Sequence, residues 1–264
     1  STDVISKYNL ARDHFEEIIL LLEFHFVGYL SYRKEEDHWI EVITPFYEWH
    51  QYLRFLEKTE APTFSKEVVK QEWFHDFAFI EEMSRLLALS SNSPQQVASL
   101  QENLLTQRAL DKLLLTHLAK IEQGTLYSEE GGLLWLEKDL ETKALYLYRH
   151  PANLASFSHN ERQIRDAEKA TRRVLHGKWV LFEDFLKGVT VALGDTPQVM
   201  IQKTGKIYRY AFPSYSDKEK QWLKTVIFSW LFETGMVAIG STDVGNEPKD
   251  CFCVTSFGRF CFEE

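Results

Sequence analysis

Glycine and proline are scarce in this chain, with 12 and 7 residues among 264. So few of them exclude a collagen-like repeat and a low-complexity linker protein, both of which need these residues in bulk. Long apolar runs are missing too, since the best candidate, Ile18–Leu22, is followed by Glu23 and His25. A membrane-spanning helix needs about 20 consecutive apolar residues. We therefore expect no membrane partner.

Cysteine is limited to Cys251, Cys253 and Cys261, all within the last fourteen positions. An odd, clustered set makes a poor disulfide framework and indicates a reducing, cytoplasmic location. A zinc site would need a fourth ligand, and the nearest histidine in sequence is His176. We expect the cysteines to serve as small apolar side chains in the final strand region, with no metal bound.

The sequence motifs of common enzyme classes are absent. The chain contains no G-x-x-x-x-G-K-[ST], G-x-G-x-x-G, H-E-x-x-H, C-x-x-C or G-x-S-x-G pattern. His14 and Glu17 are better explained as a solvated helix pair than as ligands, and His75 beside Asp76 has no nucleophile near it in sequence. We predict a binding module without catalytic residues or cofactors. An active site assembled only in space remains a third, less favoured alternative.

Charge is unevenly distributed, although the formal net charge is −9. The first 150 residues carry 15 basic and 25 acidic side chains, whereas the rest carry 15 and 14. Between Arg172 and Lys224 there are ten basic and five acidic residues. The first part of the chain should repel nucleic acid, so any face that contacts nucleic acid belongs to the second part.

The last third of the chain has the clearest pattern of elements. Ser216 with Glu219 predicts a capping box at a helix N-terminus. Gly235 is expected to end this helix, and two strands, 236–239 and 251–255, follow it around a polar loop. The apolar side chains of the helix fall on one face, at helical spacing: Trp222, Leu223, Val226, Ile227, Trp230 and Leu231.

Two earlier stretches repeat this order of helix, glycine, extended segment, polar tip and second apolar segment. In the first, Gly28 follows the helix, a charged tip lies at 33–37 and the second segment starts at Trp39. In the middle stretch, Gly124 is expected to stop the helix and 129–132 to form the turn. The helical stripes are Phe15, Ile18, Ile19, Leu22 and Phe26 in the first stretch and Leu110, Leu113, Leu114, Leu118 and Ile121 in the middle one.

These patterns predict a mainly α protein with small β-hairpins (α+β), built from tandem winged-helix-like units. Hydrophobic residues at 44% and aromatic residues at 14% are enough for ordered cores. We expect a first winged-helix-like unit at 1–60, which need not be complete, a second, helix-rich one at 61–150 and a third at 151–264.

Basic side chains in the third unit are the candidate nucleic-acid contacts. In a winged helix, the helix that begins after Ser216 would be the recognition helix and would present its polar side to phosphates. An ordinary solvated face explains the same residues, because acidic side chains lie among them, and we favour that alternative two to one. The candidates are Arg172, Arg173, Lys178, Lys203, Lys206, Arg209, Lys218, Lys220 and Lys224.

Two segments of the third unit also carry a resemblance to a known family. Residues 172–187 (RRVLHGKWVLFEDFLK) read as a helix, a Gly-x-Trp-Val turn and a second helix. Residues 222–240, with 254–259 (VTSFGR), read as a helix, a strand and a closing Gly-Arg. Together they resemble the winged-helix regions of bacterial helicase-associated proteins, those related to the N-terminal part of the helicase XPB. The resemblance covers about the last hundred residues and implies a nucleic-acid-associated accessory region.

Two functions from different classes follow. The first is a non-catalytic accessory or regulatory module that contacts double-stranded DNA through its third unit. The alternative is an acidic winged-helix scaffold for protein–protein interaction within a larger complex, for which 19 Phe, 11 Tyr and 7 Trp provide anchors. DNA binding that falls steeply with salt would favour the first function. Salt-insensitive binding to one protein would favour the second.

Overall fold

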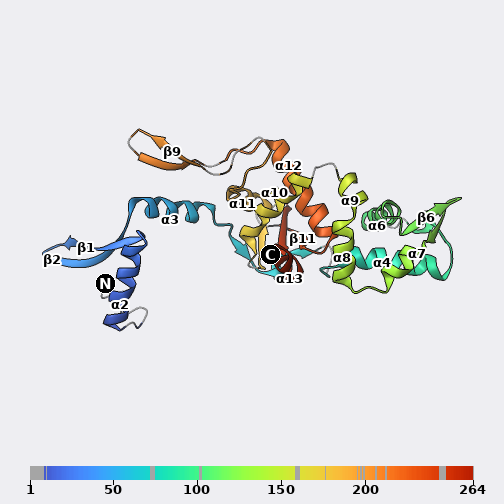
Figure 1. The fold of residues 1–264 in the computed structure, drawn as a ribbon, viewed down its shortest axis with the longest axis horizontal. Helices are drawn as coiled ribbons and strands as arrows, with labels where there is room; N and C mark the ends of the chain where they lie inside the picture. The colour runs from blue at the N-terminus through green and yellow to red at the C-terminus, as the bar shows by residue number, and fades with distance from the viewer. Residues whose placement is uncertain are drawn as a thin grey trace. The chain divides into compact units, whose positions relative to one another are not determined.

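The chain folds into two compact units, and each is described by itself (Figure 1). Unit 1 consists of 1–60 and 199–212, and unit 2 consists of 61–198 and 213–264. The computed structural model describes residues 9, 11–71, 75–100, 103–157, 161–175, 177–194, 196, 198, 200–205, 207–211, 213–243 and 248–263.

The described residues of unit 1 form two helices and two antiparallel hairpins. The first hairpin pairs Gly28 with Pro45 and runs in continuous register to Glu35 and His38. Phe26 has a positive φ of 54°, which ends the first helix and turns the chain into the hairpin. The predicted first helix and charged tip are therefore confirmed, but Phe26 of the predicted stripe lies beyond the helix, and both Phe26 and Ile18 are exposed. The elements are α2 (Arg12–Phe24), β1 (Gly28–Glu35), β2 (His38–Pro45), α3 (Tyr47–Thr59), β9 (Met200–Thr204) and β10 (Ile207–Ala211).

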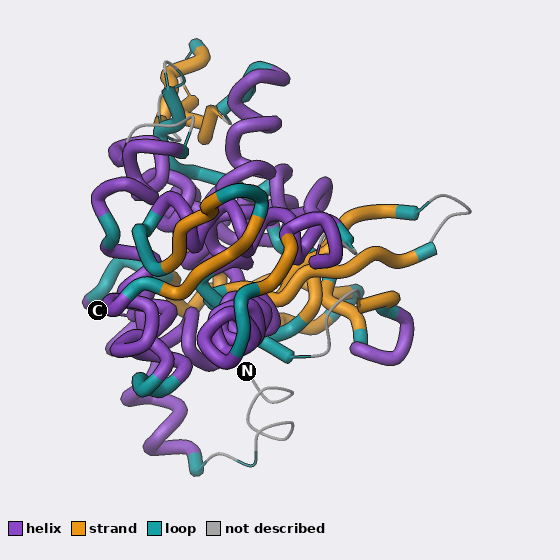
Figure 2. Tube along the Cα trace, turned by 90° about the vertical axis from the view of Figure 1, so that its right-hand side faces the viewer, coloured by secondary structure: helices purple, strands orange, loops and turns teal. Residues whose placement is uncertain are grey.

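The first half of unit 2 follows the order helix, strand, helix, helix, strand, strand. Its three strands form an antiparallel sheet in the order β5-β7-β6. Seen from the side nearest this sheet, helices lie around the paired strands (Figure 2). The elements are α4 (Ala78–Asn92), β5 (Gln95–Gln96), α5 (Val97–Leu100), α6 (Leu104–Leu115), β6 (Ala119–Glu122) and β7 (Thr125–Ser128).

The second half of unit 2 repeats this order of elements and of strands. Its central strands lie in the order β8-β12-β11, and the two short strands β3 and β4 extend the sheet at opposite edges. Helix α12 continues directly into a π-helical segment, η3. The elements are β3 (Thr63–Phe64), η1 (Lys66–Val68), β4 (Lys70–Gln71), α10 (Glu161–Thr171), η2 (Arg172–Val174), β8 (Trp179–Leu181), α11 (Phe182–Lys187), α12 (Asp217–Thr225), η3 (Val226–Leu231), β11 (Val237–Thr242) and β12 (Lys249–Val254).

Three helices connect the two halves, and one hydrophobic core joins them. The connecting helices are α7 (Glu130–Leu136), α8 (Leu140–Arg149) and α9 (Pro151–Ser156), and α13 (Ser256–Glu263) closes the chain. The shared core is formed by fully buried side chains from both halves, including Ile80, Met83, Leu113, Trp135, Leu147, Phe185, Ile227, Trp230 and Phe252. Burial of this many large apolar groups is the main stabilising contribution to unit 2.

The helix formed by α12 and η3 agrees with its sequence prediction. Ser216 and Glu219 make a reciprocal capping box, and all six side chains of the predicted apolar stripe are buried. Gly235 has a φ of 71° and ends the helix. The strands run two or three residues beyond the predicted ranges at some ends, and the helix at 256–263 was not predicted.

The prediction for the middle stretch places the helix end and the turn too late in the sequence. The helix α6 ends at Leu115, and the Thr116 hydroxyl donates to the Lys112 carbonyl at the helix end. Leu118 and Ile121 lie outside the helix, and Gly124, with a φ of 76°, occupies the hairpin turn. The predicted turn at 129–132 instead begins α7. Leu118 and Ile121 continue the helical spacing of apolar residues beyond Leu115, so the sequence pattern does not reveal where the helix ends.

The predicted α+β class is confirmed, with helices and small antiparallel sheets. The division into three winged-helix-like units stays a prediction. The boundary at residue 60 coincides with the division between the two units, whereas the predicted second and third units share one core. Within its described residues, the predicted first unit has the order helix, strand, strand, helix, and so differs from both halves of unit 2.

Candidate functional site

The predicted basic residues near Gly177 have different environments. Arg172 is exposed, whereas Arg173 is half-buried, and its guanidinium packs on Gly188, where an added Cβ would approach it to 1.4 Å. Burial lowers the pKa of Arg173. Lys178 is exposed and borders a cleft of about 480 Å³ together with Lys66. Arg173 thus fills space inside unit 2, and Arg172 and Lys178 face solvent.

Three of the predicted basic residues fall on the β9–β10 hairpin, which belongs to unit 1. Lys203 lies on β9 and is exposed. Arg209 lies on β10, opposite Gln202. The side chain of Arg209 and all of Lys206 lie outside the described residues. The hairpin is inserted between α11 and α12, so sequence proximity to the predicted recognition helix did not place it in the same unit.

The predicted recognition helix α12 presents its lysines to solvent, but two of them are held by carboxylates. Lys218 is exposed. The Lys220 Nζ lies 3.0 Å from a carboxylate oxygen of Asp217, and Lys224 forms an ion pair with Asp250 of β12. The positive charge that α12 offers to a polyanion is therefore reduced by its own neighbours.

Lys220 and Lys224 also line a cleft of about 680 Å³ between α11, α12 and β12, which we call the lysine cleft. Lys187 and Lys249 complete its basic lining. Lys187 pairs with Asp184, and the Lys249 Nζ lies 3.5 Å from Glu183. All four lysines of the cleft thus have a carboxylate of this chain within ion-pair distance. Phe182, Leu186 and Tyr215 supply apolar surface.

Hydrogen bonds at the start of α12 position this cleft. The Tyr215 hydroxyl donates to the carbonyls of Val189 and Val191, at 3.2 and 2.6 Å. Glu219 accepts hydrogen bonds from Ser216 and from the Thr196 backbone and hydroxyl. Burial would raise the pKa of Glu219, but these hydrogen bonds outweigh it and lower the pKa. A negative carboxylate at a helix N-terminus stabilises α12.

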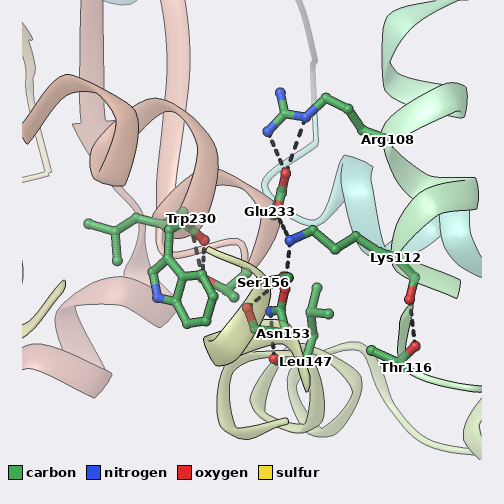
Figure 3. Close-up of polar contacts among 10 residues, drawn as sticks. Arg108, Lys112, Thr116, Leu147, Asn153, Ser156, Trp230 and Glu233 are labelled. Carbon is green, nitrogen blue, oxygen red and sulfur yellow. Dashed lines mark hydrogen bonds and ion pairs between the residues drawn. The ribbon is translucent and has the colours of Figure 1, made fainter. Parts of the chain in front are cut away.

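A buried polar network joins the two halves of unit 2 (Figure 3). Glu233, only 4% exposed, follows η3 and receives the Arg108 guanidinium, whose Nε lies 3.1 Å away. The Lys112 Nζ lies 3.2 Å from the other Glu233 oxygen and donates to the Asn153 Oδ1 at 2.6 Å. Asn153 is 1% exposed and donates to the Leu147 carbonyl. The network thus connects α6, α9 and the end of η3.

This network constrains the relative position of the two halves of unit 2. Two N–H groups of the Arg108 guanidinium converge on the Glu233 Oε1, and the Lys112 ammonium lies beside the Oε2, so both carboxylate oxygens are held by cations of α6. A buried carboxylate without its cations would be strongly unfavourable, so the halves are constrained to the arrangement that keeps them together. The network holds the predicted recognition helix of the second half against the matching helix of the first.

Unit 1 exposes many large apolar side chains. Among its described side chains, the buried apolar ones are Phe15 and Ile19. One face of α2, formed by Leu20, Leu21 and Phe24, is 57% to 78% exposed, and we call it the α2 apolar face. The other exposed large apolar residues of this unit are Ile18, Phe26, Tyr29, Tyr32, Trp39, Tyr47, Leu53 and Leu56. Exposed apolar side chains that share one face, as on α2, are typical of interaction sites.

The cysteines pack as small apolar side chains. Cys251 is fully buried beside Trp179 and Ala238, and Cys253 packs against the same cluster. Burial raises the pKa of Cys251 to about 12 and that of Cys253 to about 11. Among the residues that the structure describes, no three His, Cys, Asp or Glu side chains lie close enough to hold a metal ion.

Sequence reasoning missed the features that depend on long-range contacts. Arg108 and Glu233 are 125 positions apart, and neither belongs to a recognisable motif. The sequence prediction for α2 placed Phe15, Ile18, Ile19, Leu22 and Phe26 on one apolar stripe and did not single out the face formed by Leu20, Leu21 and Phe24. A helix with apolar residues on two sides is a signal for a partner.

Comparisons with known proteins identify no relative. No protein-family model, no curated protein and no solved structure matches the chain. In the described part of the chain, no helix is both long enough and apolar enough to cross a membrane.

Proposed function

We propose that this chain is a protein-interaction module in which unit 2 is a rigid body and unit 1 supplies an apolar contact surface. The observation that carries the proposal is the exposed apolar surface of unit 1. Phe24 is 78% exposed, Phe26 73% and Trp39 67%. A partner that covers such a side chain removes apolar surface from water, which contributes about 25 cal/mol of binding free energy per Å² buried. Aromatic side chains also dominate the energetics of protein interfaces.

Both halves of unit 2 match the element order of a winged helix. That fold consists of a helix, a strand, two helices and a two-stranded wing, with the first strand beside the last. The order α4-β5-α5-α6-β6-β7 and the order α10-β8-α11-α12-β11-β12 both agree with it, as do the strand orders β5-β7-β6 and β8-β12-β11. We therefore propose tandem winged-helix halves, joined by the Glu233 network into one body that presents the partner-binding surfaces.

The charge on the predicted recognition helix supports a protein partner over DNA. A helix that binds phosphates gains affinity from each cation that releases counterions. Lys220 and Lys224 already have intramolecular carboxylates, Asp217 and Asp250. The net charge of −9 adds long-range repulsion from a polyanion.

A paired-variant interaction experiment tests this proposal. Leu21→Ser/Phe24→Ser removes apolar surface from α2, whereas His14→Ser/Glu17→Ser places the same new residues at exposed polar positions of that helix. Proteins bound to the tagged wild-type chain in its source cells would be quantified by mass spectrometry. We expect a defined partner to be lost about tenfold or more in the first variant, to be retained in the second and to persist at high salt. Equal recovery with both variants would refute the proposal.

DNA binding is a second candidate function, and the lysine cleft favours it. The cleft lies between the two helices and the wing strand of the second half, where winged helices contact DNA. Binding of the wild type to a short labelled duplex and to its single strand should be measured from low to physiological salt. A Lys218→Glu/Lys220→Glu/Lys224→Glu variant is the comparison. Binding that falls steeply with salt and vanishes in the variant would establish this function, and no binding at low salt would exclude it.

A further inference from the structure

A third pocket of unit 2 is lined by cations from different elements. It lies between α8, α10 and α13 and has a volume of about 340 Å³, the size of a small ligand site. Arg149 at the end of α8, Arg165 and Lys169 of α10, and Arg172 just beyond it contribute positive charge. We call this the arginine pocket. Of these four residues, only Arg172 was singled out by the sequence.

Two arginines of the pocket, Arg149 and Arg172, are positioned to pair with a ligand. Arg165 pairs with Glu161 on its own helix, and the Lys169 Nζ lies 3.4 Å from Asp166. Arg149 and Arg172 are exposed, and no carboxylate of the described residues lies within ion-pair distance of either. Guanidinium groups in a fixed setting bind carboxylates with two parallel hydrogen bonds.

Among the described residues that line the pocket, the acidic side chain is Glu168, and one of its oxygens already accepts a hydrogen bond. The Tyr148 hydroxyl donates to its Oε1 at 2.8 Å. Burial raises the pKa of Glu168, while Tyr148, Arg165 and Arg172 act against that rise. The Glu168 carboxylate thus takes part in the contact between α8 and α10. The exposed arginines therefore determine the charge that a ligand encounters.

Apolar groups form the remaining wall. Met236 and Phe262 are nearly buried, at 1% and 5%, whereas Phe260 is 65% exposed on α13. An exposed aromatic ring beside two arginines matches a ligand that carries both carboxylates and an apolar side chain. A bare phosphate backbone would leave Phe260 without a contact, and a purely apolar helix would leave the arginines without one.

We propose that the arginine pocket binds an acidic peptide segment of a protein partner, with carboxylates on Arg149 and Arg172 and one apolar side chain against Phe260. The proposal rests on the interaction function proposed above and adds the chemistry of the partner. It also gives unit 2 a contact of its own, distinct from the α2 apolar face of unit 1.

Fluorescence anisotropy with a labelled acidic peptide tests the pocket directly. The probe is a short Glu/Asp-rich peptide with a single Phe, and the comparison probes replace Phe with Ser or all acids with Lys. The Arg149→Glu/Arg172→Glu variant is compared with Lys58→Glu/Lys138→Glu, which makes the same change of net charge at exposed positions outside the pocket lining. Phe260→Ser tests the apolar wall, and Arg172→Gln is a milder variant in case the double reversal does not fold.

We expect saturable binding of the acidic peptide to the wild type and to the Lys58/Lys138 variant. Affinity should fall at least about tenfold in the Arg149/Arg172 variant and several-fold in Phe260→Ser. Equal losses in both charge-reversal variants would indicate unspecific attraction and overturn the proposal, as would absence of binding. A single-stranded oligonucleotide that binds more tightly than the peptide and is lost in the same variants would replace it with a nucleic-acid site.

The two proposals fail separately. Loss of the partner in Leu21→Ser/Phe24→Ser without any peptide binding would leave the interaction function standing and remove the arginine pocket. Peptide binding at the pocket with an unchanged set of partners in the α2 variant would remove unit 1 as the contact surface.

Discussion

Glu233 connects the two halves of unit 2 through a buried carboxylate. It is 4% exposed and carries two cations from α6 at once, Arg108 and Lys112. Hydrophobic contacts are non-directional and tolerate some sliding, whereas this carboxylate fixes the two halves at one relative position. Buried ion pairs contribute little net stability while intact, but they become costly once one member is removed.

Glu233→Gln is therefore expected to destabilise unit 2 by about 3 kcal/mol, because it keeps the side-chain volume and leaves two cations without their counter-charge. Chemical unfolding followed by tryptophan fluorescence measures this change, since Trp230 lies one turn away in the same helix. The matched control is Glu122→Gln, which breaks the exposed pair with Lys120 and should leave the transition unchanged. An equal transition midpoint for both variants would show that the network has no role as a lock.

Glu168 gives unit 2 a pH dependence of predictable sign. Burial raises the pKa of Glu168 above its ordinary value of 4.5, so the folded chain holds this proton more tightly than the unfolded chain. The associated stability is complete below pH 4.5 and is lost as pH rises through the folded-state pKa. Glu168→Gln should remove this part of the slope while keeping an acceptor for Tyr148. Unfolding free energies measured across about pH 4 to 8 test it, with exposed Glu161→Gln as control, and parallel wild-type and Glu168→Gln curves would contradict it.

At the scale of elements, two adjacent glycines of α7 have opposite requirements. Gly131 is exposed, with no atom within 4 Å of an added Cβ, whereas a Cβ on Gly132 would lie 2.2 Å from the Leu118 carbonyl oxygen. Gly131→Ala should stabilise unit 2 by about 0.5 kcal/mol because alanine restricts the unfolded chain. Gly132→Ala should destabilise it by about 2 kcal/mol, since backbone must move. Thermal unfolding of the two variants compares them directly, and a shift of the same sign in both would show that helix propensity outweighs this contact.

The sequence predicts elements well where a local signal specifies them. The Ser216–Glu219 capping box and Gly235 determine both ends of the helix formed by α12 and η3, whereas only Phe15 and Ile19 of the five-residue stripe predicted for α2 are buried. It fails at the end of α6, where Leu118 and Ile121 continue a helical period although the chain has already turned. Strand pairing between residue 63 and residue 180, or an ion pair between Arg108 and Glu233, has no local signal at all. The candidate sites depend on such contacts, so the arginine pocket and the network emerge only from the fold.

At the scale of the whole molecule, the two units differ in how their stability arises. Unit 2 has a shared core of large side chains from both halves, a buried ionic lock and a five-stranded sheet. Unit 1 buries Phe15 and Ile19 and exposes most of its other described large apolar residues. A unit with so little buried apolar area gains little free energy on folding by itself. Its ordered state is expected to depend on a partner that covers the exposed surface.

Native-state hydrogen exchange followed by mass spectrometry tests this difference within the intact chain. Amides of α2 and of the β1–β2 hairpin should exchange through low-energy local opening, whereas amides of α4, α6 and η3 should exchange only with global unfolding of unit 2. We expect protection factors at least about a hundredfold lower in unit 1. Leu21→Ser/Phe24→Ser should leave the exchange of unit 2 unchanged, because the α2 apolar face contributes nothing to its core. Equal protection of both units would mean that unit 1 is stable alone, and its exposed aromatic surface would then be a preformed binding site and not one that folds with its partner.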